Sequence, residues 1–276
     1  MKKEDKKKIK KTKLNEEKLD DNLDDDNKID EEFTDVDTHH SFKIIKNLFI
    51  IFILLVIFVR FYGVSQVVTK EYSIISEEIP KGFDGMKIVQ ISDIHYGTTI
   101  NESSLKKMVN KVNQLKPDII VFTGDLIAKG INPTDKIKAE ITVNLSKLEA
   151  TIGKYAIASN EDLESDSFSD LITNSGFTLL NNEAKLIYNN DDEPIELVGI
   201  SDINSKIELT DNYKIALIHK PDDFDNIKND NYNIVMAGHN HGGIIRLPFL
   251  GGLINIEGAK KYHKDYYEIY NTKLYV

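Results

Sequence analysis

Two histidines, His239 and His241, stand two positions apart in the segment MAGHNHGG, residues 236–243. Neutral imidazole is the commonest metal ligand among protein side chains, and glycine lets the backbone turn tightly enough to aim two rings at one ion. The apolar residues 234–236 precede the pair, so the pattern predicts a strand that opens into a metal-binding turn. Histidine pairs on loops are frequently incidental. The prediction therefore depends on whether other apolar segments are also followed by residues that can bind a metal.

Polar donors follow each of five apolar segments that are typical of buried strands. In open α/β sheets, ligands bind outside the carboxyl ends of the strands, so we expect these donors to share one rim of the fold. The seven oxygen and nitrogen donors are Asp93, His95, Asp125, Asn160, His219, His239 and His241. Seven ligands exceed the needs of one four-coordinate ion and suit two ions that share a bridging carboxylate.

Each donor alone also has a purely structural explanation. A buried histidine is usually a hydrogen-bonded core residue, Gly-Asp is a common turn, and an aspartate after a strand often caps a helix. These roles do not readily explain why five strand ends all carry donors, which favours a metal site. The chain has 0 Cys, so thiolate ligands are excluded and the donors suit Mn, Fe, Zn or Mg.

A βαβ unit is predicted to open the folded part of the chain. Residues 86–91 form a short apolar strand, Asn101 caps a helix with apolar residues at helical spacing, and Pro117 stops that helix. Residues 118–122 form a second strand, parallel to the first because a helix lies between them. Further strands are predicted at 154–158, 195–200, 213–218, 232–237, 244–247, 265–270 and 273–276, and further helices at 137–148 and 168–175. The pattern predicts an α/β sandwich, with sheets packed face to face and helices outside.

The N-terminal part of the chain differs in composition from the rest. Residues 1–41 hold a lysine-rich block and then an acidic block, which cannot bury enough apolar surface to fold, so we expect a disordered tail. Residues 42–64 contain an unbroken apolar run at 48–59 near basic residues, which predicts one uncleaved transmembrane anchor. A buried core helix is disfavoured because the segment has no polar face, and a cleaved signal peptide because no A-x-A site follows. Residues 65–85 are then a connecting segment and residues 86–276 the folded domain.

Charge indicates the surroundings in which this domain works. Lysines ahead of the anchor favour a cytoplasmic N-terminus, which would place the domain outside the cytoplasm, attached to the cell membrane by a single span. The net charge of −10 argues against a nucleic-acid partner, because general nucleic-acid binders use basic surfaces to neutralise phosphates. The charge is compatible with a site where bound metal supplies local positive potential.

The ordered series of donors resembles the calcineurin-like metallophosphoesterase superfamily, and more narrowly its small bacterial branch, which is often membrane-anchored or exported. The segments that carry the resemblance are ISDIH at 91–95, GD at 124–125, IHKPD at 218–222 and GHNHGG at 238–243. The resemblance implies a metallophosphoesterase-type β-sandwich flanked by helices, in four layers α/β/β/α.

The resemblance also implies two divalent metal ions as cofactors, with manganese favoured over iron or zinc. Asp93, His95 and His241 would hold the first ion, Asn160, His219 and His239 the second, and Asp125 would bridge both. The two ions would lower the pKa of a bridging water, and the resulting hydroxide would attack phosphorus in line with the leaving group. No protein nucleophile is needed for such a reaction.

One position departs from the family pattern. The family's third motif is normally Gly-Asn-His followed by Asp or Glu, whereas this chain has Ser159-Asn160-Glu161-Asp162. Glu161 stands where a histidine helps to protonate the leaving group, so it is the candidate catalytic residue. An ionised carboxylate there would repel an anionic substrate, which predicts slower turnover or a restriction to good leaving groups. Related sequences also continue past a strand like that at 273–276, which predicts either a dispensable tail or a less stable domain.

Three other residues are weaker candidates. Arg246 is a candidate phosphate contact because guanidinium suits bidentate phosphate binding, and Tyr96 and His263 are candidate cleft residues. We expect structural roles for all three.

Together these patterns predict a membrane-anchored phosphoesterase that hydrolyses phosphodiester or pyrophosphate bonds. Its substrate would be a small phosphorylated molecule, a lipid-linked one or a nucleotide sugar, and only proximity to the membrane motivates the lipid. The alternative is a catalytically weak, metal-stabilised binding or sensor protein on the membrane, which the glutamate at Glu161 would favour. Turnover separates these two hypotheses.

Overall fold

A computed structural model of the chain describes residues 41–58, 67–98, 100–241, 246–247, 251–252 and 256–276. Two compact units, Met1–Gln66 and Val67–Val276, make up the chain and are treated separately here. The predicted tail lies outside the described residues except for Ser41, and so do residues 59–64 of the predicted anchor.

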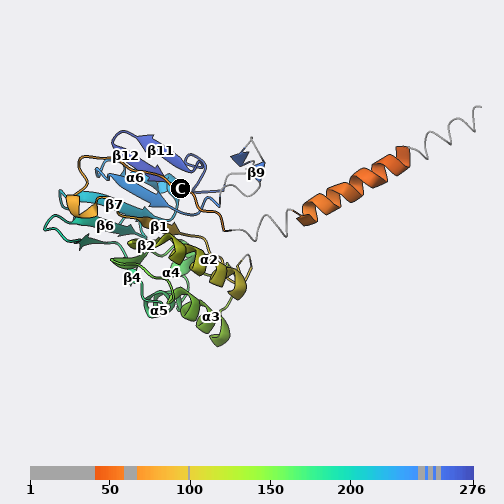
Figure 1. Ribbon diagram of the computed structural model, residues 1–276, viewed down its shortest axis with the longest axis horizontal. Coiled ribbons are helices and arrows are strands. Elements are labelled where there is room, and N and C mark those ends of the chain that lie inside the picture. The colour runs from red at the N-terminus through yellow and green to blue at the C-terminus, as the bar shows by residue number, and fades with distance from the viewer. Residues whose placement is uncertain (1–40, 59–66, 99, 242–245, 248–250, 253–255) are drawn as a thin grey trace, which may run out of the picture. The chain divides into compact units, whose positions relative to one another are not determined.

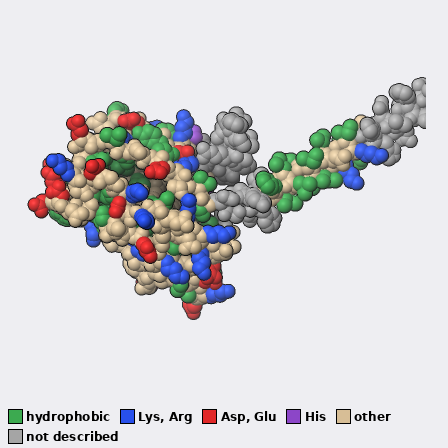
Figure 2. Space-filling view, viewed as in Figure 1, with side chains coloured by type: hydrophobic (Ala, Val, Ile, Leu, Met, Phe, Trp, Pro, Cys, Tyr) green, Lys and Arg blue, Asp and Glu red, His purple; other side chains and the backbone are tan. Residues whose placement is uncertain are grey.

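A helix at Ser41–Phe58 is the described part of the first unit. Its 18 residues have a mean hydropathy of 2.3, and by length and composition it can cross a membrane. Figure 2 shows apolar side chains along the helix, and they are exposed rather than packed against protein. An apolar surface without a polar face is suited to lipid, in agreement with the anchor expected from the sequence.

The second unit begins with a parallel sheet of four strands in chain order. Its strands are β1 (Ile88–Ile91), β2 (Ile119–Phe122), β3 (Gly153–Ala156) and β4 (Thr178–Leu179). The helices that connect them are α2 (Glu102–Leu115), α3 (Asp135–Leu145), α4 (Asn160–Leu163) and α5 (Phe168–Asn174). Parallel neighbours require crossover connections, and these helices supply them.

Helix α2 illustrates how local sequence fixes an element. The Asn101 side chain accepts a hydrogen bond from the Ser104 amide at 3.0 Å, which satisfies one of the free N–H groups at the helix start. Leu105, Val109 and Val112 recur at helical spacing and are buried. The helix ends at Leu115, before Pro117, as the sequence predicts.

A mixed sheet of six strands packs against the first. Its order is β11-β12-β8-β7-β6-β5, with bounds Tyr266–Ile269, Thr272–Tyr275, Ile234–Ala237, Tyr213–Ile218, Ile195–Ile200 and Glu183–Ile187. The four central strands run parallel, and β11 and β5 pair antiparallel at the two edges. A separate pair, β9 (Arg246–Leu247) with β10 (Gly251–Gly252), is antiparallel.

Strand β2 shows how the layers are held together. Successive side chains of a strand point to opposite faces, so Ile120 and Phe122 enter the core beneath the helices, whereas Ile119 and Val121 enter the core between the sheets. The outer face of the second sheet has its own core, where Phe224 of α6 (Phe224–Ile227) packs. Figure 1 shows the resulting layers of helices, sheet, sheet and helix. The predicted four-layer α/β/β/α fold is confirmed.

One buried amide joins the two sheets close to their carboxyl ends. The Gln90 side chain donates to Thr123 Oγ1 at 3.0 Å and to the Ala237 carbonyl at 2.8 Å. Gln90 belongs to β1, Thr123 follows β2, and Ala237 ends β8. This link aligns the ends of strands from both sheets, which is where the polar donors lie.

Several short elements were absent from the sequence prediction. Strand β4 has only two residues, and β5 carries the sequence EAKLI with mostly exposed side chains, so neither shows a clear apolar pattern. Helix α4, η3 (Pro221–Asp223) and α6 are each a single turn. The predicted connecting segment is also more than a spacer, because Ile74 and Ile79 pack against the core between the sheets and Lys81–Phe83 forms a 3-10 turn, η2.

Candidate metal centre

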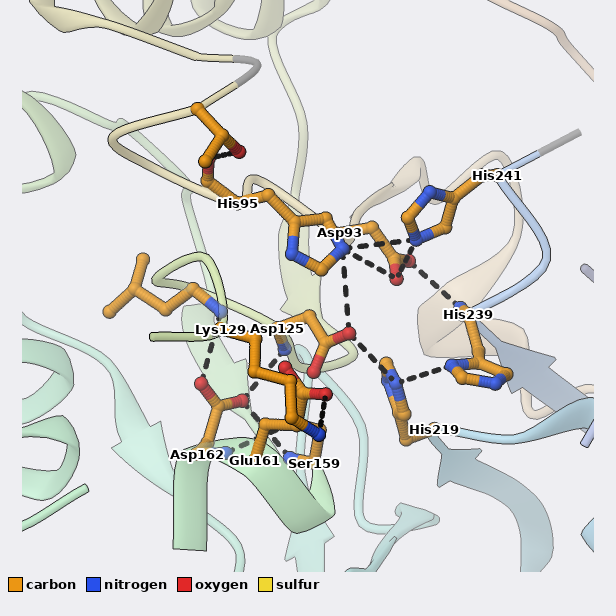
Figure 3. Close-up of polar contacts among 12 residues, drawn as sticks. Asp93, His95, Asp125, Lys129, Ser159, Glu161, Asp162, His219, His239 and His241 are labelled. Atoms are coloured by element: carbon orange, nitrogen blue, oxygen red, sulfur yellow. Dashed lines mark hydrogen bonds and ion pairs between the residues drawn. The ribbon is translucent and has the colours of Figure 1, made fainter. Parts of the chain in front are cut away.

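Six of the seven predicted donors converge at the rim formed by the ends of β1, β2, β7 and β8 (Figure 3). They fall into two overlapping groups, in each of which the donor atoms lie within 4.8 Å of one another. The first group is Asp93, His95, Asp125 and His241, and the second is Asp93, Asp125, His219 and His239. Two carboxylates therefore belong to both groups, as in a site for two ions.

The first group is built around His95 and His241. Their Nε2 atoms lie 3.0 Å apart, and the Nε2 of His241 lies 3.1 Å from Asp93 Oδ1. The Nε2 of His95 is 3.5 Å from Asp125 Oδ2 and 3.8 Å from Asp93 Oδ1. Four donor atoms thus face one small volume.

The second group is built around His219 and His239. The Nε2 of His219 lies 3.1 Å from Nδ1 of His239 and 3.3 Å from Asp125 Oδ2. Asp125 Oδ2 therefore lies within 3.5 Å of an imidazole from each group, so this carboxylate stands between the two. That position is the one expected of a bridging ligand.

Backbone carbonyls orient two of the imidazoles. Nδ1 of His219 is 2.8 Å from the Thr123 carbonyl, and Nε2 of His239 is 2.7 Å from the Glu257 carbonyl. A carbonyl only accepts, so each of these nitrogens carries the proton and donates it. The other nitrogen of each ring then has its lone pair free and directed toward the centre, which is the arrangement that metal-ligating histidines usually show.

The backbone at the rim adopts an uncommon conformation. The residues in the left-handed region are Asp93, His95, Asp125, His239 and His241, with φ angles of 53°, 44°, 61°, 67° and 51°. Asp and His adopt this region more readily than most residues, yet it remains uncommon for any side chain other than glycine. Such turns directly after the strands let residues at i and i+2 direct their side chains to the same centre.

Two glycines permit the close approach of these turns. Gly124 has a φ of +101°, and a Cβ there would lie 2.9 Å from both His219 Nδ1 and the Ser159 amide. A Cβ at Gly238 would overlap the Ser92 hydroxyl and lie 2.9 Å from Asp93 Oδ2. Side chains at either position would push the donors apart.

A buried carboxylate, Asp162, holds the loop after β2 in place. It accepts the Asp125 amide at 2.7 Å, the Leu126 amide at 3.0 Å and the Ser159 amide at 3.0 Å. Ser159 caps α4 by accepting the Asp162 amide at 3.1 Å, so the two residues form a capping box. The bridging position of Asp125 is thus fixed through its own backbone.

The electrostatics of the rim favour bound cations. Burial raises the pKa of Asp93 and Asp125, but hydrogen bonds and charge from His241 and His219 outweigh it, and both carboxyl groups have lowered pKa values. Burial lowers the pKa of His219, but the hydrogen bond to Asp125 and its charge outweigh burial, so this pKa is raised overall. The hydrogen bond to Asp93 raises the pKa of His241. Burial lowers the pKa of His239. The lowered pKa values of Asp93 and Asp125 keep negative charge at the rim, which favours bound cations.

The donor set fits divalent metal ions. It combines carboxylate oxygens with imidazole nitrogens, which suits manganese, iron and zinc. Asp125 Oδ1 is buried and has no hydrogen-bond partner among the described residues, which leaves an acceptor ready for a cation.

The remaining predicted residues have varied positions. Asn160 begins α4 next to the cap residue Ser159, and its role as a ligand stays a prediction. Glu161 pairs with Lys129 at 3.1 Å. Tyr96 is buried and donates to Glu140 at 2.5 Å, so it packs in the core as expected rather than lining a cleft.

The structure describes the side chain of His263 but not that of Arg246. His263 is exposed, and its carbonyl accepts a hydrogen bond from the Asn240 side chain at 2.6 Å, so its backbone supports the turn between His239 and His241. The side chain of Arg246 lies outside the described part of the chain.

Some supporting residues were not recognised in the sequence. Asp162 had a usable signal, because Ser159 followed three residues later by an acidic residue is a capping-box pattern. The carbonyls of Thr123 and Glu257 had none, since any residue type can supply a backbone acceptor. Lys129 had none either, because its partner Glu161 is distant in sequence.

Comparisons with known proteins agree with this geometry. A family model described as calcineurin-like phosphoesterase matches residues 86–243. The chain is 35% identical over 234 residues to the uncharacterized metallophosphoesterase YkuE of Bacillus subtilis, covering 79% of this chain and 80% of the relative. It is 27% identical to the UDP-2,3-diacylglucosamine pyrophosphatase LpxG of Chlamydia muridarum, covering 66% and 75% of the two chains. It is 24% identical to the phosphodiesterase YaeI of Escherichia coli, covering 60% and 64%.

The family match spans more than half of the chain, and YkuE matches most of it. The resemblance inferred from the donor motifs is confirmed, and with it the prediction of an enzyme rather than a purely structural protein. The chain belongs to the calcineurin-like phosphoesterase family and is a hydrolase of phosphate esters.

Proposed function

We propose that this protein is a membrane-anchored phosphoesterase with two manganese ions, which hydrolyses phosphodiester or pyrophosphate bonds of lipid-linked or nucleotide-sugar substrates. The observation that carries the proposal is the shared carboxylate of Asp125. Its Oδ2 lies 3.5 Å from His95 and 3.3 Å from His219, one imidazole of each donor group. Sharing of this kind suits two ions a few ångströms apart, the spacing used for in-line displacement at phosphorus.

The proposed ligand assignment is the one that the family resemblance implies, and it differs from the two donor groups in giving Asn160 rather than Asp93 to the second ion. Asp93, His95 and His241 would hold one ion, Asn160, His219 and His239 would hold the other, and Asp125 would contribute to both. Two divalent ions, when bound, activate water as the nucleophile and neutralise charge on the phosphoryl oxygens. The protein contributes orientation: the Thr123 and Glu257 carbonyls fix the protonated nitrogens of His219 and His239, and Asp162 holds the backbone of Asp125.

The substrate class is supported by location and by relatives. The helix at Ser41–Phe58 keeps the enzyme at a membrane, where lipid-linked phosphates are concentrated. LpxG is named for a pyrophosphatase activity on a diacylated nucleotide sugar, and YaeI is named a phosphodiesterase. Both names describe phosphorus with two ester or anhydride substituents, which favours diesters and pyrophosphates over monoesters.

We place the catalytic unit on the outer side of the membrane. Lysines ahead of the anchor favour a cytoplasmic N-terminus, and a single span then carries everything after it across. Labelling of residues in the catalytic unit by a membrane-impermeant reagent in intact cells tests this orientation, and labelling only after lysis would contradict it.

The test of the activity uses the full chain purified in detergent. We expect hydrolysis of bis-p-nitrophenyl phosphate with manganese to be lost with EDTA and in Asp125→Ala, and to exceed hydrolysis of p-nitrophenyl phosphate. Hydrolysis of a diacylated UDP-sugar at its pyrophosphate would support the lipid-linked substrate class. Folded protein that binds two metals without any turnover would instead favour the membrane-anchored binding or sensor protein.

A further inference from the structure

An ion pair links the loop that follows Asp125 to the helix that begins at Asn160. The Nζ of Lys129 lies 3.1 Å from Oε1 of Glu161 (Figure 3). Lys129 follows Asp125 by four residues on the loop between β2 and α3, and Glu161 follows Asn160 on the first turn of α4. Each partner is therefore close in sequence to a proposed metal ligand.

The position of this pair is fixed from the helix side. Glu161 and Asp162 are consecutive on α4, and Asp162 accepts the amides of Asp125 and Leu126 at the start of the Lys129 loop. The Ser159 cap holds Asp162 in turn. Helix α4 thus contacts the loop in two places: Asp162 binds the backbone amides of Asp125 and Leu126, and Glu161 pairs with the Lys129 amine.

The amine of Lys129 keeps donors available for an anion. An ammonium group has three N–H donors, and the described contacts use one of them, toward Glu161. The side chain is 80% exposed, whereas that of Glu161 is 35% exposed, so the amine is the accessible member of the pair. Glu161, and more weakly Glu164 and Asp125, raise the pKa of Lys129, so the amine is charged at neutral pH.

Stability gives little reason for such a pair. Exposed ion pairs contribute little to the free energy of folding, because solvent screens them and two long side chains lose freedom. A positive charge on the loop that carries Asp125, in a chain of net charge −10, instead suits recognition of a negatively charged substrate.

We infer that Lys129 binds a phosphoryl oxygen of the substrate beside the metal centre, and that Glu161 positions the Lys129 amine. The inference rests on the proposed phosphoesterase function. It gives Glu161 the role of a positioning residue rather than that of the proton donor expected from the sequence.

The test uses the manganese-loaded full chain in detergent and two readouts, steady-state kinetics and calorimetric titration with inorganic phosphate. Lys129→Met is expected to raise the Kd for phosphate and the KM for the diester about tenfold, the loss typical of a hydrogen bond to a charged group. Lys136→Met is the matched control, because the Lys136 side chain is 83% exposed and its Nζ lies 3.6 Å from Glu140 on α3. Phosphate binding by the control should equal that of the wild type.

The role of Glu161 is tested by non-additivity. Glu161→Ala is expected to weaken phosphate binding when Lys129 is present, and to cause no weakening in the Lys129→Met background, where there is no amine to position. Equal weakening in both backgrounds would overturn the positioning role. A Lys129→Met protein that binds phosphate as tightly as the wild type, or a wild type that binds none, would overturn the inference. Absence of chelator-sensitive turnover in the wild type would instead refute the proposed function.

Discussion

Backbone conformation at single residues decides whether the rim can gather its donors. Asp93, His95, Asp125, His239 and His241 all have positive φ, a conformation that costs a non-glycine residue on the order of 1–3 kcal/mol unless neighbours enforce it. The neighbours that enforce it include Asp162, which binds the backbone amides of Asp125 and Leu126. Donor placement therefore depends on residues that contact no metal.

Asp162→Asn tests this dependence. An amide side chain has one acceptor oxygen and an NH₂ group that would face a backbone N–H, so at least one of the three buried amides loses its partner. We expect the metal-free protein to lose about 1–3 kcal/mol of unfolding free energy in urea, and manganese affinity to fall. Asp170→Asn, at an exposed position on α5, is the control, and equal stability of the two variants would contradict the role of Asp162.

Gly238→Ala tests the close contact between the ends of β1 and β8. The new methyl group would overlap the Ser92 hydroxyl and crowd Asp93, so we expect lower stability and weaker metal binding. Ser92→Ala removes the overlapping oxygen and should restore part of the stability of the Gly238→Ala protein, as measured by thermal unfolding. If the double variant is no more stable than Gly238→Ala, the predicted collision is wrong.

The residue types at the site were predictable, whereas their supports were not. Motif spacing and the endings of apolar segments pointed to the six donors that converge, because chemistry restricts metal ligands to few residue types. The ion-pair partner of Glu161 could not be predicted from the sequence, since Lys129 is 32 residues away along the chain and only the folded structure brings the two together. The same holds for the carbonyls of Thr123 and Glu257.

At the scale of elements, the site requires two sheets with aligned carboxyl ends. β1 and β2 supply Asp93, His95 and Asp125 from one sheet, whereas β7 and β8 supply the other histidines from the second. Gln90 links these ends through Thr123 and Ala237. The alignment of the two sheets therefore determines how far the donors of one sheet lie from those of the other.

Strong patterns made most elements predictable. β6 and β7 match the predicted ranges 195–200 and 213–218, because mostly apolar runs of this length are typical of buried parallel strands. β5 was missed because its edge position leaves most of its side chains exposed. Its strand conformation comes from pairing with β6 and not from an apolar pattern in its own sequence. The single-turn helix α4 was missed because its capping box, not periodicity, defines it.

Asp118 gives a prediction for the opposite ends of the first sheet. It accepts the Thr151 hydroxyl at 2.6 Å and the Lys87 amide at 2.8 Å, and these hydrogen bonds lower its pKa. A lowered carboxyl pKa stabilises the fold above the unfolded value of about 3.9, and this stabilisation disappears as the pH falls through the folded value.

The measurement compares urea unfolding of wild type and Asp118→Asn between pH 7 and pH 2. The variant should be less stable at pH 7, and the difference should shrink below about pH 4 as the wild-type carboxyl group takes up a proton. A difference that stays constant over this range would mean that the charge of Asp118 contributes nothing to the free energy of unfolding.

At the scale of the whole molecule, the catalytic unit has its own cores and includes the segment after the anchor. Ile74 and Ile79 pack between the sheets, Lys70 pairs with Asp265 at 2.7 Å, and the Tyr72 ring lies 5.2 Å from that of Tyr275. The compact unit Val67–Val276 therefore includes most of the predicted connecting segment 65–85.

Deletion of residues 1–66 tests the division into anchor and catalytic unit. We expect the remaining protein to stay folded by circular dichroism and to leave the membrane fraction, because the lost helix carries the long apolar surface. A further deletion to residue 85 should reduce the thermal unfolding temperature, since it removes packed apolar side chains. A shortened protein that still sediments with membranes would contradict the anchor role of Ser41–Phe58.

Counting metal ions tests whether two ions share Asp125. Purified full chain saturated with manganese should hold two ions per chain, with an electron paramagnetic resonance spectrum of a spin-coupled pair. Asp125→Ala should lose that coupling. One uncoupled ion per chain in the wild type, or an unchanged coupled pair in Asp125→Ala, would contradict the account.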